Sequence, residues 1–189
     1  MLLQRELSGL LLVDVQEKLT PHVMRSEKMR LCCEWLVRLA QTLDVPVLVS
    51  EQYPKGLGQT VESLRVAVNT YSPIEKVHFS CFKQEGFMKH WDRLLKKQIV
   101  IAGIETHVCV LQTAMDIQQN TDNDVFVVVD AVSSRSELDH KYGLKRMKQA
   151  GIELVTAEMV FFEWVRQAGT PEFKMLSKSF LQSPNEREL

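Results

Sequence analysis

Residues 99–110 read IVIAGIETHVCV, in which four apolar residues are followed by a glycine and then by a segment that carries Cys109. A short, unbroken apolar run is typical of a strand buried on both faces of a sheet. Gly103 permits a sharp turn out of this strand, and Thr106 is a suitable N-cap for a helix over residues 106–119. The stretch therefore predicts a β–α unit with Cys109 in the first turn of the helix.

The same alternation of strand and helix continues along the chain. Short apolar runs predict strands at residues 10–15, 45–49, 72–77, 99–102, 125–129 and 152–155. Helical spacing of apolar residues predicts helices at residues 27–43, 59–67, 85–95, 106–119, 138–150, 157–167 and 171–181. Strands that are apolar throughout and alternate with helices predict an α/β fold. We expect a doubly wound, Rossmann-type three-layer sandwich, with a six-stranded parallel sheet and helices on both faces.

No linker, internal repeat or low-complexity segment divides the 189 residues, so we expect one domain over residues 1–189. Hydrophobic residues make up 45% and charged residues 25%, as in soluble globular proteins. The formal net charge of -1 argues against a nucleic-acid binder and against a polybasic membrane anchor. No apolar run approaches the roughly 18 residues that span a bilayer. We therefore expect neither nucleic acid nor membrane among the partners.

The chain has four cysteines, at positions 32, 33, 81 and 109, and we expect no disulfide framework among them. The N-terminal sequence MLLQRELSGLLLVDVQ is not a signal peptide, because its short apolar run leads directly into Asp14. The sequence contains no Cys-x-x-Cys pair, and such a pair would be the signature of a zinc ribbon or a thioredoxin-type redox motif. We expect four thiols in a reducing compartment, the cytoplasm. Cys32 and Cys33 lie in a predicted amphipathic helix, and we interpret them as packing residues. We interpret Cys81 as a buried residue near the candidate site described next.

Three chemically active side chains lie at or just beyond the ends of predicted strands. Asp14 comes after LLLV, Lys76 comes at the end of SPIEK, and Cys109 follows IVIA by seven residues. In open α/β sheets, ligands bind beyond the carboxyl ends of the strands. Each residue taken alone has a structural alternative: a hydrogen-bonded core aspartate, a solvated lysine at a sheet edge, or a buried packing cysteine.

Together the three residues predict a nucleophilic site. Asp14 could accept the proton of the Cys109 thiol, and Lys76 would pair with the carboxylate and favour a thiolate. The first turn of a helix also favours a thiolate and offers free N–H groups to an oxyanion.

These segments also resemble a known family. LLLVDVQ at residues 10–16, EKVHFSCF at 75–82 and IVIAGIETHVCV at 99–110 resemble the isochorismatase-like hydrolases, or cysteine hydrolases. SEQYPKGLGQTV, DAVSSRS and FEWVRQAGTPEFK are still more similar to the isochorismatase domain-containing branch. The resemblance extends from about residue 8 to residue 181.

The resemblance implies a role for each matching position. Asp14 corresponds to the catalytic carboxylate, Lys76 to the catalytic lysine and Cys109 to the nucleophile. The N–H groups of Glu105 and Cys109 would form the oxyanion hole, within a loop that has a cis peptide bond between Ile104 and Glu105. The implied fold is the same six-stranded parallel sheet.

The family resemblance also implies self-association, commonly as dimers or tetramers, so we expect a homo-oligomer. Aromatic residues in the predicted helices could belong either to an interface or to the core. They are Trp35, Trp91, Phe161, Phe162 and Trp164.

Two departures from family patterns narrow the expected chemistry. Nicotinamidases of this superfamily carry an Asp-x-His metal motif after the second strand, where this chain reads SEQYPKG without histidine. We therefore expect no catalytic zinc or iron, no other cofactor, and a substrate other than nicotinamide. True isochorismatases cleave a vinyl ether and need no cysteine nucleophile, so Cys109 favours acyl transfer.

The predicted function is hydrolysis of a small molecule at an amide-type C–N bond, through a thioester on Cys109. A binding or assembly protein that retains the fold, and a vinyl-ether hydrolase, are the alternatives. Substitution of Cys109 by alanine would leave vinyl-ether hydrolysis intact. Residues near strand ends are expected to line the substrate pocket: Gln16, Leu19, Gln52, Tyr53, Phe79 and His107.

Overall fold

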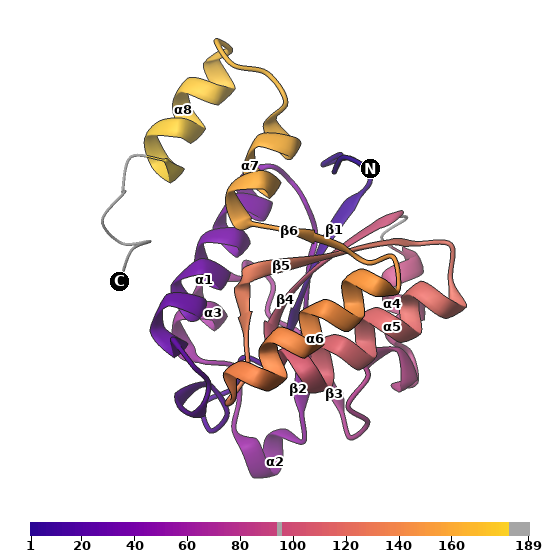
Figure 1. Cartoon of the computed structure of the whole chain (residues 1–189). Helices are drawn as coiled ribbons and strands as arrows, with labels where there is room; N and C mark the ends of the chain where they lie inside the picture. Colours follow the sequence, from indigo (N-terminus) through magenta and orange to yellow (C-terminus); the bar gives the residue numbers. More distant parts are fainter. Residues whose placement is uncertain (94–95, 182–189) are drawn as a thin grey trace.

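The computed structural model describes residues 1–93 and 96–181, and its centre is one parallel sheet (Figure 1). The strands are β1 (Ser8–Val13), β2 (Val47–Gln52), β3 (Ile74–Lys76), β4 (Gln98–Ile104), β5 (Asp124–Ser133) and β6 (Glu153–Val155). Their order in the sheet is β3-β2-β1-β4-β5-β6, and all neighbours are parallel. The predicted doubly wound α/β fold is confirmed. Its topological switch point, where the strand order reverses, lies between β1 and β4.

Helices cover both faces of this sheet. They are α1 (Ser26–Thr42), α2 (Pro54–Leu57), α3 (Glu62–Ala67), α4 (Phe87–Arg93), α5 (Leu111–Asn120), α6 (Glu137–Gln149), α7 (Ala157–Val165) and α8 (Pro171–Phe180). Two 3₁₀ turns, Thr20–His22 and Cys81–Lys83, and a π-helical turn, Thr106–Val110, complete the elements of the described segments. The helix predicted at residues 85–95 extends into positions 94 and 95, which lie outside the described residues.

The sheet separates two apolar cores. Leu10 and Leu12 of β1 belong to the core beneath α1, α3, α7 and α8. Leu11 and Val13 belong to the core beneath α4, α5 and α6, on the opposite face (Figure 1). Successive strand residues point to opposite faces, so a strand between two helical layers must be apolar at every position. This is why the strand runs in the sequence show no alternation.

Several predicted boundaries need correction. β4 continues through Gly103 to Ile104, and β5 continues to Ser133, four residues beyond its predicted end. The helix predicted at residues 106–119 is a π-helical turn followed by α5. Thr106 is not an N-cap: Glu105 occupies that position, without a capping side-chain bond. The threonine hydroxyl instead contacts a side chain of α6, so tertiary contact overrides the local capping preference.

The aromatic residues belong mainly to the core. Trp91, Phe161 and Trp164 are at most 2% exposed. Trp35 is half-buried and donates from Nε1 to the carbonyl oxygen of Phe180, 3.1 Å away. Phe162 is 47% exposed. Within the described residues, no helix is long and apolar enough to cross a membrane.

Candidate active site

Asp14 lies at the turn that ends β1. It has φ 51°, in the left-handed region that aspartate tolerates better than most residues. Its N–H donates to the carbonyl oxygen of Ser50 in β2, at 3.2 Å, and its side chain is fully buried. A buried carboxylate needs strong partners, since desolvation of an unpaired charge costs several kcal/mol, roughly.

Lys76 is the principal partner of this carboxylate. The lysine ends β3, and its Nζ lies 2.6 Å from Asp14 Oδ2, with both side chains completely inaccessible to solvent. Lys76 Nζ also donates to Gln52 Oε1 at 2.7 Å and to the carbonyl oxygen of Phe79 at 3.0 Å. Ser50 Oγ donates to Asp14 Oδ1 at 2.7 Å. Both carboxylate oxygens are therefore bonded by residues of neighbouring strands.

The charge state of Lys76 follows from two opposing causes. Burial lowers the pKa of the lysine, whereas the adjacent Asp14 carboxylate raises it, and the net result is a pKa above the ordinary value. The ammonium group is thus protonated at neutral pH, and the pair is an ion pair.

Cys109 lies in the π-helical turn after β4 and is 6% exposed. Its thiol lies close enough to the Asp14 carboxylate and the Lys76 ammonium for both charges to act on it. Burial and then the negative charge of Asp14 raise the pKa of Cys109, and Lys76 opposes them only in part. The thiol therefore keeps its proton in the resting protein, which leaves Asp14 the role of proton acceptor that the sequence predicts. The predicted meeting of Asp14, Lys76 and Cys109 does occur.

Gly103 allows the segment after β4 that carries Cys109, here called the nucleophile loop, to lie against β1. It has φ 118°, and a Cβ at this position would come 2.0 Å from the carbonyl oxygen of Val13. No side chain fits there, so glycine is required where β4 passes the end of β1. This close approach places the Cys109 turn beside Asp14. The peptide bond between Ile104 and Glu105 is cis, as the family resemblance implies.

Cys81 is a second buried thiol beside the Asp14–Lys76 pair. Its N–H donates to Thr113 Oγ1 at 2.9 Å. Burial and the Asp14 charge raise the pKa of Cys81 to about 11, against the opposing effects of Lys76, Ser50 and Thr113. This thiol stays protonated, and it is buried near the site as predicted.

The two cysteines of α1 behave as packing residues, as predicted. Cys33 is fully buried and donates from Sγ to the carbonyl oxygen of Ala131 at 3.3 Å. Burial raises its pKa far above the ordinary value. Cys32 is half-buried and packs against the core beneath α1.

Two residues expected in the substrate pocket have structural hydrogen bonds. Gln16 is fully buried; its Nε2 donates to the carbonyl oxygens of Gln52 at 2.9 Å and Gly58 at 2.7 Å, and its Oε1 accepts from Gln52 N–H at 2.7 Å. Gln52 is 8% exposed and holds Lys76. Gln16, expected to line the substrate pocket, thus bonds to backbone atoms.

The remaining expected pocket residues are more accessible. Tyr53 is 54% and Phe79 is 52% exposed, one after each of the strands β2 and β3. Leu19 packs at the margin of the core beneath α1. His107 is half-buried and bonds through Nδ1 to Ser134 Oγ at 2.9 Å.

The sequence alone did not reveal Ser50 or the contacts that α6 makes with the nucleophile loop. Ser50 had a weak signal, because it is the first polar residue after the apolar run of β2, which reads VLVSEQ. Ser134 and Arg135 lie in the family-like segment DAVSSRS, but nothing in the sequence showed that they or His140 bond to the loop after β4. Their role depends on β4 and β5 being neighbours in the sheet.

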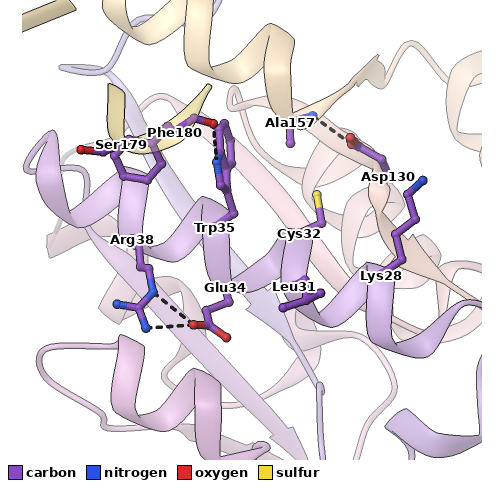
Figure 2. Close-up of a pocket in the computed structure, with 10 residues that line it drawn as sticks. All are labelled: Lys28, Leu31, Cys32, Glu34, Trp35, Arg38, Asp130, Ala157, Ser179 and Phe180. Atoms are coloured by element: carbon purple, nitrogen blue, oxygen red, sulfur yellow. Dashed lines mark hydrogen bonds and ion pairs between the residues drawn. The ribbon is translucent and has the colours of Figure 1, made fainter. Parts of the chain in front are cut away.

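No group of three or more histidine, cysteine, aspartate or glutamate side chains that could hold a metal ion occurs in residues 1–93 and 96–181. A cavity of about 370 Å³ lies elsewhere, between α1, Asp130 of β5, the start of α7 and α8 (Figure 2). Trp35 and Phe180 form part of its wall, and Asp130 at its edge accepts a bond from Ala157 N–H at 2.9 Å. Its lining includes none of the three residues that meet at the switch point.

The fold and site define a doubly wound α/β protein with a buried carboxylate, lysine and thiol at its switch point. The chain belongs to the isochorismatase domain family, whose model matches residues 8–159. It is 38% identical to isochorismatase domain-containing protein 2A of Mus musculus, over 92% of this chain and 82% of that protein. The family is one of isochorismatase-like hydrolases.

Two solved structures illustrate how far the likeness extends. The MAR1 ribonuclease of Caenorhabditis elegans superposes with a TM-score of 0.88 at 35% identity, covering 97% of this chain and 94% of that one. The YcaC gene product of Escherichia coli, an octameric hydrolase of unknown specificity, gives a TM-score of 0.85 at 27% identity. The alignment with YcaC covers 95% of this chain and 96% of that one.

Proposed function

We propose that the chain is a metal-independent cysteine hydrolase that cleaves a small amide-type C–N bond through a thioester on Cys109. The observation that carries this proposal is that one buried carboxylate, Asp14, is paired with the Lys76 ammonium and lies near the Cys109 thiol, on which its charge acts. A nucleophile joined to a base, and a base held by a third group, is the arrangement that covalent catalysis requires.

The acylation half of the reaction starts from the protonated thiol. Asp14 takes the proton as Cys109 Sγ attacks the carbonyl carbon, so that charge never has to rest on a buried thiolate. The oxyanion that forms accepts hydrogen bonds from the N–H groups of Glu105 and Cys109. The C–N bond then breaks, Asp14 returns the proton to the nitrogen, and the amine leaves.

Hydrolysis of the thioester completes the cycle. Asp14 takes a proton from water as the water oxygen attacks the thioester carbonyl, and the C–S bond breaks with return of the proton to Cys109. Lys76 and Ser50 hold Asp14 in place throughout. A positioned proton-transfer group contributes roughly 10²- to 10⁴-fold in rate, and an oxyanion donor about 10²- to 10³-fold.

The substrate in this proposal is a small molecule, and Tyr53 and Phe79 supply apolar surface beside the site. The protein works as one domain, without a metal or other cofactor, in the cytoplasm. We further propose a homo-oligomer. Support comes from the octameric assembly of the YcaC gene product and from apolar side chains exposed on this chain, Tyr53, Val77 and Phe79 among them.

The test is a screen of small amides and ureas with the wild-type protein and the Cys109→Ala variant. Cys32→Ala is the matched control, because it removes a half-buried thiol remote from Asp14. We expect the first variant to lose turnover by at least about 10²-fold and the control to retain it. Equal turnover by wild type and Cys109→Ala would refute the thioester mechanism.

The same variants separate the other candidate functions. A vinyl-ether hydrolase would keep its activity in Cys109→Ala and lose it in Asp14→Asn. A binding or assembly protein would hydrolyse none of the compounds. Because one solved relative is named a ribonuclease, an RNA substrate belongs in the screen. Cleavage of RNA that disappears in Cys109→Ala would replace the amide by a phosphodiester as the substrate bond.

A further inference from the structure

Two consecutive residues of the loop after β4 are bonded to the segment after β5. Glu105 Oε2 accepts hydrogen bonds from Arg135 N–H, at 2.9 Å, and from Arg135 Nε, at 3.2 Å. Thr106 Oγ1 lies 2.9 Å from His140 Nδ1, and the two atoms hydrogen-bond. Thr106 is fully buried, so its hydroxyl needs this partner.

The next residue of the loop is held in the same way. His107 Nδ1 hydrogen-bonds to Ser134 Oγ at 2.9 Å. The backbone of His107 also lies directly against α6, where a Cβ added to Gly143 would come 3.2 Å from His107 Cα. Residues 105, 106 and 107 are thus each hydrogen-bonded to the segment after β5. A fourth contact is the close approach of the Gly143 backbone to that of His107.

These contacts matter because the loop includes both proposed oxyanion donors. Glu105 supplies one N–H group, and Cys109, two residues beyond His107, supplies the other. Such donors act only when they lie within about 0.5 Å of the productive geometry. Since Glu105 and His107 are only half-buried, core packing alone does not fix this part of the loop.

We propose that Ser134, Arg135, His140 and Gly143, here called the α6 clamp, position residues 105–109 so that their N–H groups meet the oxyanion. This inference rests on the proposed function and adds positioning residues to it. The clamp residues act through the loop and do not take part in proton transfer. Altering the clamp should therefore slow reactions that pass through an oxyanion and spare other reactions of the same thiol.

Two reagents separate these reactions of Cys109. p-Nitrophenyl acetate acylates a cysteine through a tetrahedral oxyanion, and its release of p-nitrophenolate gives the rate. Iodoacetamide alkylates the same sulfur by displacing iodide at a CH₂ carbon, without an oxyanion. The ratio of the acylation rate to the alkylation rate therefore measures the oxyanion hole alone.

Gly143→Ala tests the backbone contact. Alanine in the interior of α6 is a better helix former than glycine by up to about 1 kcal/mol, so we expect the thermal unfolding midpoint to stay level or rise. The added methyl group must push His107 away by a few tenths of an ångström. We expect acylation to fall about tenfold, since a displacement near 1 Å costs on the order of 10²-fold, with alkylation changed less than about twofold.

Thr106→Val tests the side-chain bond with little change in shape. We expect the same selective loss of acylation, and we expect Thr106→Ser, which restores the hydroxyl, to recover it. Thr121→Val is the matched control, because Thr121 Oγ1 donates to the carbonyl oxygen of Ile117 at the far end of α5. This control should keep the wild-type ratio.

The possible results distinguish the two proposals. If the wild-type protein is not acylated at Cys109, the proposed function fails and the clamp with it. If the wild type is acylated and both variants keep its ratio of rates, the clamp alone is wrong. An equal fall in both reactions would also overturn the clamp, because it would indicate damage to the whole site.

Discussion

The two halves of the candidate site, on either side of the switch point, are built differently. On one side, Asp14, Ser50 and Lys76 come from the ends of three adjacent strands and bond to one another out of contact with solvent. On the other side, the loop with Cys109 is held by side chains nearer the surface, such as Arg135, whose side chain is 66% exposed.

This difference has a consequence for mutagenesis. Two charges that are buried as a pair contribute to folding as well as to chemistry, because removing one of them leaves the other buried and unpaired. Bonds between half-exposed side chains contribute little to stability, and their value lies in geometry. We therefore expect changes in the first half to reduce stability and activity strongly, and changes in the second half to reduce activity with only a small effect on stability.

The largest effect is expected for Asp14→Asn, which breaks the link between the halves. Hydrolysis of an amide substrate should fall by roughly 10²- to 10⁴-fold, because the base is lost. Since the Asp14 charge helps to raise the pKa of Cys109, this pKa should fall, and the remaining Lys76 ammonium should stabilise a thiolate.

The check is the pH profile of Cys109 alkylation by iodoacetamide. In Asp14→Asn the rise of the alkylation rate with pH should occur at lower pH than in the wild type, even though the variant no longer hydrolyses the amide substrate. A profile unchanged or moved to higher pH would mean that Asp14 does not raise the pKa of the nucleophile.

Lys76→Met tests the buried half by stability. Leaving Asp14 without its cation should lower the free energy of unfolding by roughly 3–5 kcal/mol, measured by urea denaturation. The double variant Asp14→Asn/Lys76→Met should recover part of this loss, since no charge is then left unpaired. Unfolding of Lys76→Met at the wild-type urea concentration would contradict the comparison.

The smallest effect is a pH dependence from His140 in the nucleophile half. Burial and then Arg25 lower its pKa, while Glu137 raises it, and the net pKa lies below the ordinary value. The unfolded chain therefore binds a proton at higher pH than the folded chain does. Stability from this residue is present above pH about 6.5 and is lost as pH falls toward the folded pKa.

His140→Asn should accordingly show a smaller loss of stability than the wild type when the pH is lowered through this window. His90→Asn, an exposed histidine of α4, is the control. Parallel stability curves for wild type and His140→Asn would show that His140 does not couple to folding.

The two halves also differ in how much the sequence could reveal. Asp14 directly follows an apolar run and Lys76 ends a short predicted strand, so the rule that parallel strands present their carboxyl ends together was enough to bring them near Cys109. Thr106 shows the limit of local rules, because its hydroxyl bonds to His140, 34 positions away. The raised pKa of Cys109 also depends on burial and on distance to Asp14, which spacing along the chain does not contain.

Covalent capture of an acyl group tests the central claim most directly. The wild-type protein and Cys109→Ala are mixed with p-nitrophenyl acetate, quenched at intervals, digested and mapped by mass spectrometry. We predict one acetyl group on the peptide that contains Cys109, appearing early and lost by hydrolysis, and no such adduct in the variant. An acetyl group carried by another residue alone, or a wild-type protein that is never acetylated, would contradict the assignment of Cys109 as the nucleophile.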